Sequence, residues 1–501
     1  MISIIFVTLT ILVIALVYIY LKQCYAPRRD DLPGVQPHIF FGNLLNSGIL
    51  KQESTFNQVL IDYQRRFGDK FQYWFGSHRC LVFCRVEHAQ AIFSDRHTFE
   101  QSPLFLPNFD LFCPNGIAML TGAKWKRHIR VLLPMLKRAK IVGHLAMITQ
   151  CTDRFIDRYL HAGQIHRNLY AACQSLTMNV IGLIGFDCDF DTHVDSPIKK
   201  AFLDFIFHST LLMITPWTPR WLGKIYLRFN RKYQRAYQLV HKLAEKLVKQ
   251  EQNKQSEIED ERPKTLIASL VSSLNEEAND ENISSGLNHV EIFDEVVMMI
   301  LAGYDTTSTT LAWFIFFASK NPRVQQRMKD ELREHNLMMT DDPNYLPSLT
   351  PNNLASLTYC EYVTKEVLRL APTASFTTRI ATRDTILDDV KINRGQTIFI
   401  ALHNINTDAR YWHHADPKEF VPERYLAEDQ NHHPLAMITF GGGHRACIGQ
   451  ELAWFELKAA IVRLMQRGIT FEDTPENTGG YEELITCFPK SLAVRVRFEK
   501  S

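Results

Sequence analysis

The chain has 501 residues, of which 46% are hydrophobic and 22% are charged, as in a globular protein with a large core. Its 56 basic residues nearly balance its 54 acidic residues, so the net charge is only +2 and no basic stripe indicates nucleic-acid binding. The ten cysteines are scattered without a CxxC pair, which favours reduced thiols in the cytosol. Composition and charge therefore argue against a nucleic-acid-binding protein and against a small disulfide-rich secreted domain.

The first 21 residues, "MISIIFVTLTILVIALVYIYL", carry no charged side chain, and about 20 apolar residues suffice to span a bilayer as a helix. We expect residues 1–21 to be a transmembrane anchor. A cleaved signal peptide is the alternative, but it would need a basic start, a shorter apolar run and a small-residue cleavage site. Lys22, Arg28 and Arg29 follow the span, so the positive-inside rule places the bulk of the chain in the cytoplasm.

The remaining chain is predicted to contain a connector and one catalytic body. Residues 22–50 are basic and contain "DDLPGVQP", a stiff, non-helical sequence suited to a hinge. Residues 51–501 show no internal repeat and no clean division. Helical periodicity dominates this body, and strand-like alternation is short and local. We expect helices in 55–68 and 233–252, strands in 71–76, 80–85, 385–402 and 492–499, and solvated polar loops in 250–264 and 275–286.

A long apolar helix is predicted over residues 290–319. A second membrane span is the obvious alternative, but Asp294, Glu295 and Asp305 interrupt it, and isolated carboxylates are costly inside a bilayer. Its centre, "AGYDTT" (302–307), is rich in poor helix formers, and such local inconsistency is expected at functional sites. The structural alternative is that Gly303 permits close packing while Thr306 bonds back to its own helix.

Three further segments carry polar residues in distinctive patterns: "YCEYVTKEVLRLAP" (359–372), "DPKEFVPERYL" (416–426) and "FGGGHRACIG" (440–449). Each has an ordinary explanation on its own. Glu366 and Arg369 form a weak i, i+3 helix pair, and glycines around a cysteine can be a simple turn beside a small apolar residue. A zinc site at His444 and Cys447 would lack two further ligands at a suitable spacing, and a phosphate loop would need a GK[ST] ending.

Taken together, the four motifs resemble, in order and spacing, those of the cytochromes P450, and the resemblance covers essentially the whole chain. It implies a mainly α fold with small β-sheets. It also implies that Cys447 is the thiolate ligand of haem b iron, beside the free amides of the helix that begins near Ile448. By the same resemblance, the residues around the haem are Arg445, Arg379, Trp125, Phe440, Gly443, Gly449 and Ala302, and a buried structural cluster consists of Glu366, Arg369 and Arg424.

Two positions depart from the family pattern. The family's W-x-x-x-R helix would place a basic residue four after Trp125, where this chain has Ile129. His128 and Arg130 are the neighbouring candidates for the missing contact, and the sequence leaves open which of them, if either, supplies it. The smaller departure is Tyr425, where phenylalanine is usual.

The resemblance implies a monooxygenase that inserts one oxygen atom from O2 into a lipophilic substrate. Electrons would come from NADPH through NADPH–cytochrome P450 reductase, with cytochrome b5 as a second candidate partner. Thr306 is expected to donate a hydrogen bond to dioxygen, and Asp305 to relay protons. A relative that rearranges peroxides or endoperoxides without a reductase is the main alternative, and the Asp305–Thr306 pair argues against it. A haem-binding sensor or carrier is a third possibility.

The family layout also suggests surfaces for the substrate, the redox partner and the membrane. The expected localisation is the endoplasmic reticulum membrane, with a single span. Lys126, Arg127, Lys137 and Arg138 are candidates for facing the reductase, although a solvated basic face explains them equally well. The candidate pocket residues are Phe105, Phe109, Phe112, Ile300, Leu301, Ala374 and Phe376, for each of which core packing is the alternative.

Overall fold

A computed structural model describes most of the chain after the predicted hinge. The described residues are 11–12, 14–15, 17–18, 32–38, 41–102, 111–190, 193–213, 215, 219–257, 265–275, 286–339, 346–371 and 373–499. Most of the predicted anchor and much of the hinge therefore lie outside the described residues, as do Phe105 and Phe109.

Helices dominate the body and follow the apolar periodicity of the sequence. Their bounds are α2 Phe56–Phe67, α3 Val86–Ser94, α5 Gly122–Leu132, α6 Arg138–Ile141, α7 Leu145–Tyr159, α8 Leu169–Phe186, α9 Pro197–Met213, α10 Arg220–Phe229, α11 Arg231–Glu257, α12 Leu266–Ser272, α13 His289–Lys320, α14 Pro322–Glu334, α15 Pro351–Ser356, α16 Thr358–Leu370, α17 Leu402–Asn406 and α18 Gln450–Gln466.

The strands form small sheets. β1, β2, β6, β7, β8 and β12 fall in the predicted strand segments, whereas the other strands were not predicted. Their bounds are β1 Lys70–Phe75, β2 His78–Phe83, β3 Phe99–Gln101, β4 Ile165–His166, β5 Phe376–Ala381, β6 Thr385–Leu387, β7 Val390–Ile392, β8 Thr397–Ala401, β9 Ile469–Glu472, β10 Gly479–Glu483, β11 Cys487–Ser491 and β12 Val494–Phe498.

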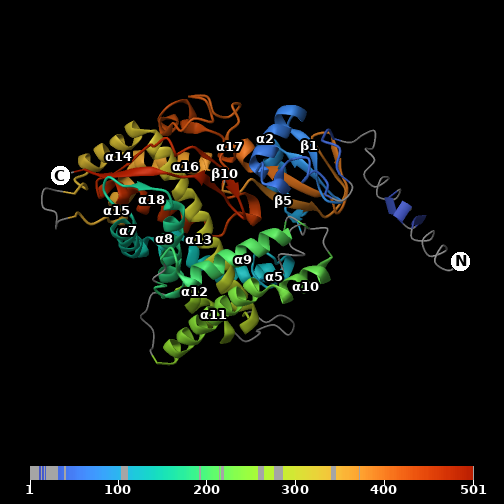
Figure 1. The fold of residues 1–501 in the computed structure, drawn as a ribbon, viewed down its shortest axis with the longest axis horizontal. Coiled ribbons are helices and arrows are strands. Elements are labelled where there is room, and N and C mark those ends of the chain that lie inside the picture. The colour runs from blue at the N-terminus through green and yellow to red at the C-terminus, as the bar shows by residue number, and fades with distance from the viewer. Residues whose placement is uncertain are drawn as a thin grey trace.

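The largest sheet has five strands in the order β1-β2-β8-β5-β3. β1 and β2 pair antiparallel as a hairpin, whereas β2 and β8 run parallel, with Cys80 opposite Thr397. The other sheets are β4-β12-β9, β10-β11 and β6-β7. Figure 1 shows the largest sheet and α2 at one end of the body and most of the helices at the other.

The helix α13 is the centre of the helical part, where it contacts α8, α11, α16 and α18 and also β9 and β11. It starts at a capping box in which Asn288 and Glu291 bond each other's backbone amides. The predicted buried helix over 290–319 is thus confirmed, with one more residue at each end. Among the described helices, one is long and apolar enough to cross a membrane: α8, in which 83% of that stretch is buried inside the protein.

Candidate functional site

The cysteine segment forms a tight loop that leads into α18. The Cys447 amide donates a hydrogen bond to the Phe440 carbonyl oxygen at 2.9 Å, which closes the loop. Gly443 has φ +68°, a left-handed conformation that favours glycine. At Gly442 a Cβ atom would lie 2.3 Å from the Phe93 ring. The glycines are therefore required by the close approach of the loop to α3.

The Cys447 thiol differs from the other described cysteines in its exposure. Cys447 is exposed and Cys188 is partly exposed, whereas the remaining described cysteines are buried. Surrounding protein raises the pKa of the Cys447 thiol, and a hydrogen bond from the Gly449 backbone amide acts in the opposite direction. A thiolate at this position would need a cation at the sulfur, and a metal ion supplies one.

Two arginines, Arg379 and Arg445, lie beside the loop, and one carboxylate, that of Glu100, pairs with Arg445. Arg379, on β5, is buried and donates a hydrogen bond to the Gly442 carbonyl oxygen at 3.0 Å. Arg445 lies 4.2 Å above the Trp125 ring and pairs with Glu100 at 2.9 Å. Burial, together with the charge of Arg445, lowers the pKa of Arg379 to about 10. The two guanidinium groups therefore carry more positive charge than Glu100 neutralises. They could bind a further carboxylate, because guanidinium and carboxylate form strong charge-assisted hydrogen bonds.

The position left open by Ile129 is resolved by the orientation of α5. His128 is fully buried and turns toward α13, where its Nδ1 lies 2.6 Å from Glu295 Oε1. Arg130 is exposed, and Ile129 packs against the apolar core. Neither candidate therefore joins Arg379 and Arg445 at the cysteine loop in the described structure.

One residue of the expected basic surface, Arg127, does not belong to it. Arg127 is partly buried and pairs with Glu291 at the start of α13. Lys126, Lys137 and Arg138 are exposed. Because the Arg127 charge is used inside the fold, only the other three remain candidates for a partner surface.

At the centre of α13, the structure shows both features of the structural alternative: Thr306 bonds back to its own helix, and Gly303 permits close packing. The Thr306 hydroxyl donates a hydrogen bond to the Ala302 carbonyl oxygen of its own helix at 2.7 Å. A Cβ at Gly303 would lie 2.9 Å from Ile181 on α8, so Gly303 is required for helix packing. Ala302 is exposed and Thr306 is partly exposed, one turn apart on the same side of the helix.

Asp305 is buried next to this exposed side and is held by hydroxyl groups. Its Oδ2 accepts a hydrogen bond from Thr486 Oγ1 at 2.9 Å, and its Oδ1 accepts one from the Tyr170 hydroxyl at 3.4 Å. Burial raises the pKa of Asp305 to about 6, and these hydrogen bonds oppose that rise. Asp305 is therefore half-ionised near pH 6 and keeps a protonated fraction at neutral pH, as an acid–base group requires. The sequence reading missed Tyr170 and Thr486.

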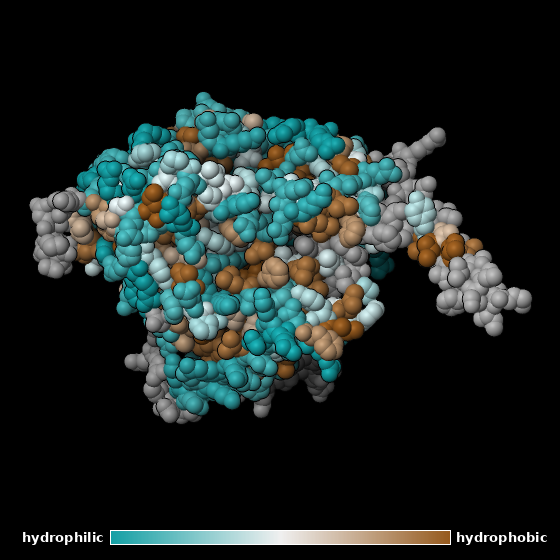
Figure 2. Space-filling view, viewed as in Figure 1, coloured by the Kyte–Doolittle hydropathy of each residue, from teal (hydrophilic) through white to brown (hydrophobic). Residues whose placement is uncertain are grey.

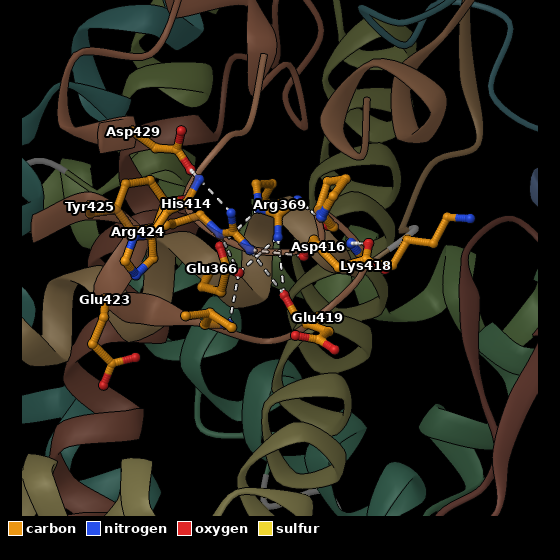
Figure 3. A network of polar contacts seen from close by, with 12 residues as sticks. Glu366, Arg369, His414, Asp416, Lys418, Glu419, Glu423, Arg424, Tyr425 and Asp429 are labelled. Atoms are coloured by element: carbon orange, nitrogen blue, oxygen red, sulfur yellow. Dashed lines mark hydrogen bonds and ion pairs between the residues drawn. The ribbon is translucent and has the colours of Figure 1, made fainter. Parts of the chain in front are cut away.

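The predicted charge cluster is fully buried (Figure 3). Glu366 Oε1 lies 2.7 Å from Arg369 Nη2 and 2.9 Å from Arg424 Nε. Arg424 also pairs with Asp429 at 3.1 Å, a partner that the sequence reading missed. Because the remaining guanidinium donors bond backbone carbonyls such as those of Asn406 and Pro417, the cluster ties α16 to the segment that precedes the cysteine loop.

The predicted pocket residues divide into two groups. Phe112 is buried against the rings of Phe205 and Tyr233, and Ile300 and Leu301 are buried in the main core. Ile300 lies about 200° around α13 from Ala302, which explains why it faces the core. For these three, the structure supports core packing instead of a pocket wall.

The other described pocket candidates follow α16. Ala374 is exposed, and Phe376 is partly exposed and stacks on Phe399 at 4.3 Å. They remain candidates for a pocket wall. The zinc alternative gains no support, because the described residues contain no group of three or more His, Cys, Asp and Glu side chains that could hold a metal ion.

The fold and the cysteine loop agree with comparisons against known proteins. A family model for Cytochrome P450 matches residues 32–477. The chain belongs to the cytochrome P450 family. It is 31% identical to cytochrome P450 3A11 of Mus musculus and 31% identical to cytochrome P450 3A7 of Homo sapiens, each over 37% of this chain and 36% of the relative. The aligned region thus spans little more than a third of these relatives.

The residues around the loop fit the haem that this family implies. Cys447 offers an exposed soft sulfur ligand, and Arg379 and Arg445, which share a single paired carboxylate in Glu100, offer a surplus of positive charge to carboxylate groups. Glycines at 442 and 443 bring the loop backbone close to α3, and α18, which follows the loop, packs against α13. The cysteine loop is thereby joined through α18 to the helix that carries Asp305 and Thr306.

Proposed function

We propose that the chain is a haem-thiolate monooxygenase that inserts one oxygen atom from O2 into a lipophilic small molecule. The observation that carries this proposal is the exposed thiol of Cys447 beside the two buried arginines. Haem, when bound, supplies the activation of dioxygen, which thiolate ligation favours. The protein supplies the ligand, the orientation, the protons and the exclusion of water.

Each of these tasks falls to particular side chains. Cys447 ligates the iron, and Arg379 and Arg445 bind the carboxylates of the cofactor. Thr306 rotates its hydroxyl away from the Ala302 carbonyl and donates a hydrogen bond on the oxygen side of the site. Asp305 exchanges protons with Thr486 and Tyr170, which already contact it. Glu366, Arg369 and Arg424 fix the haem-side core and take no part in the chemistry.

The electrons are proposed to come from NADPH through a reductase, with cytochrome b5 as a further candidate donor. The exposed side chains of Lys126, Lys137 and Arg138 support this proposal, since a basic surface steers an acidic partner domain. Arg127 is not included in this surface because it pairs with Glu291.

The body is proposed to lie on the endoplasmic reticulum membrane, held by the anchor at residues 1–21. The helix α10 supports this proposal. Its Trp221, Leu222, Ile225 and Phe229 are 63%, 43%, 45% and 76% exposed, and Figure 2 shows the hydrophobic surface over this helix. Exposed Arg220, Lys224 and Arg228 lie among them. An apolar face bordered by basic residues is typical of a helix that lies in the membrane interface.

A peroxide or endoperoxide isomerase is the second candidate function. The Asp305–Thr306 pair argues against it, because rearrangement of a peroxide consumes no protons from solvent. The two candidates differ in what they consume. Purified holoprotein with reductase, NADPH and ¹⁸O2 should place one ¹⁸O atom in the product of a lipophilic substrate. Turnover of a peroxide substrate without NADPH or O2 would instead establish the isomerase.

Thr306→Ala provides a test of the proton-delivery role. We expect the variant to release severalfold more hydrogen peroxide per NADPH oxidised, because removing one catalytic donor costs about 2.7–4 kcal/mol when it acts on the reacting oxygen. Serine at the same position should restore most of the coupling. Unchanged peroxide release in the alanine variant would contradict the role of Thr306.

A further inference from the structure

A second cavity lies away from the cysteine loop. It has a volume of about 330 Å³ and lies between α2, the C-terminal part of α13, α17 and β10, within the range of small-molecule sites. Its walls are aromatic, from Trp313, Phe316, Phe317 and Tyr481, and its polar side chains include His403 and Lys418. None of the residues that line it belongs to the cysteine loop.

The aromatic walls are fixed before any ligand arrives. Trp313 stacks on Phe317 at 5.6 Å and lies 5.4 Å from Tyr481. Its indole N–H donates a hydrogen bond to the Cys487 carbonyl oxygen at 2.9 Å, so the ring presents an apolar surface. Phe317 also stacks on Phe420 at 5.0 Å with an interplanar angle of 8°. A rigid wall of this kind costs a ligand little ordering entropy in the protein.

His403 is the buried polar group of the cavity. It is 7% exposed, and its Nδ1 has no hydrogen-bond partner among the described residues. Buried polar groups are nearly always paired, whereas His403 keeps hydrogen-bonding capacity that the protein does not use, and its Nδ1 itself is closed off from the cavity. Burial and the charges of Arg369 and Lys418 hold the pKa of His403 well below its usual range, to about 3. The imidazole is therefore neutral, in a region of positive potential.

Lys418 supplies a charge at the mouth of the cavity. Its side chain is exposed and makes no ion pair with any described residue. Figure 3 shows its ammonium group extending away from the Glu366 cluster, although the neighbouring residues belong to that cluster. Glu419 and Asp416 are the acids nearest to it in sequence; neither forms an ion pair with Lys418 in the described structure, and Asp416 accepts a hydrogen bond from the Lys418 backbone amide at 2.9 Å. The Lys418 charge therefore remains available to an incoming group.

We propose that this cavity binds a small carboxylate with an apolar body, with the body against the aromatic walls and the carboxylate at Lys418, beside His403. The positive potential selects an anion over an amine, and the four rings select an apolar chain or ring over a polar metabolite. The site is separate from the haem pocket, so the inference does not rest on the proposed monooxygenase activity.

Occupancy would connect two elements of the candidate active site. Trp313 lies on α13 two turns after Thr306, and Tyr481 lies on β10, in the hairpin that carries Thr486. The same two elements meet at the hydrogen bond between Asp305 and Thr486. A ligand in the cavity would therefore lie against the two elements that this hydrogen bond joins.

The test is equilibrium dialysis of the haem-loaded full chain with radiolabelled decanoate. A saturating iron-binding azole blocks the haem pocket, so that the remaining binding reports the second cavity. We expect one decanoate per chain under these conditions, and binding at least roughly tenfold weaker for 1-decanol and decylamine, which lack the anionic head. Loss of all decanoate binding in the presence of the azole would overturn the proposal, as would equal binding of the three head groups.

Variants at the mouth of the cavity then locate the site. Lys418→Gln should weaken decanoate binding roughly tenfold, whereas Lys418→Arg should retain it. Lys391→Gln, at another exposed lysine, is the matched control and should have no effect. Because Lys418 is exposed, these variants are expected to fold. A photoreactive diazirine analogue of decanoate should label the peptides that contain Lys418 or Tyr481, and unchanged binding by Lys418→Gln or labelling elsewhere would contradict the assignment.

Discussion

The protonation of Asp305 depends on two opposing effects at one carboxyl group. Burial raises its pKa to about 6, whereas hydrogen bonds from Thr486 and Tyr170 lower it. Because the folded pKa lies above the usual value of 3.8, the protonated carboxyl stabilises the fold at low pH. This contribution is complete below the unfolded-state pKa and is lost as the pH rises through about 6.

Thr486→Val tests this balance at Asp305. Loss of one hydrogen bond to the carboxylate should raise its pKa further, so the midpoint of ionisation should move to higher pH by roughly one unit, since one unit corresponds to 1.36 kcal/mol. Infrared spectroscopy of the protonated carboxyl stretch measures the midpoint directly. Asp305→Asn, which lacks the group, identifies the band. An unchanged or lower midpoint in Thr486→Val would show that Thr486 does not hold the carboxylate.

The sequence identified site residues that lie within one short motif, and it missed residues that reach the site from distant segments of the chain. Cys447 and Arg445 are part of one ten-residue motif, which the sequence displays in full. Tyr170 and Thr486 lie 135 and 181 residues from Asp305. Each is an ordinary hydroxyl residue within its own segment. Only the packing of α8 and the β10–β11 hairpin against α13 brings them to the carboxyl.

At the scale of the elements, α5 and α13 are joined by a buried polar contact that periodicity does not reveal. His128 and Glu295 are both fully buried, and each keeps one side-chain polar atom without a hydrogen-bond partner in the described structure. Burial raises the pKa of Glu295, and the hydrogen bond from His128 opposes the rise. The helix α13 and strands such as β1, β2 and β12 were predictable because their apolar patterns are local, whereas this contact depends on how two helices meet.

His128→Leu should therefore destabilise the fold by about 1–3 kcal/mol, because the Glu295 carboxyl loses its partner inside the core. Urea unfolding of the haem-loaded protein measures the change. The double variant His128→Leu, Glu295→Leu should regain most of the loss, since it removes both polar groups. Arg130→Leu, at an exposed position on the same helix, should unfold like the parent. A loss of the same size in Arg130→Leu would contradict a specific role for the pair.

At the scale of the whole molecule, the proposed attachment to the membrane makes a prediction for α10. In full-length protein reconstituted into bilayers, brominated acyl chains should quench the fluorescence of Trp221, which is 63% exposed. Trp221→Phe should remove most of the quenchable emission, because fluorescence from a ring in the interface is accessible to lipid. Trp412→Phe, at a position that is 1% exposed, should leave the quenchable fraction unchanged. Equal quenching in the parent and Trp221→Phe would show that α10 does not touch the bilayer.

The central claim is that Cys447 ligates haem iron, and the carbon monoxide difference spectrum of the reduced protein tests it most directly. The parent should show the red-shifted Soret band of a thiolate-ligated haem. Cys447→Ala should lose this band, and Cys188→Ala, at the other described cysteine with exposed surface, should keep it. A red-shifted band that persists in Cys447→Ala, or a parent protein that takes up no haem, would contradict the account.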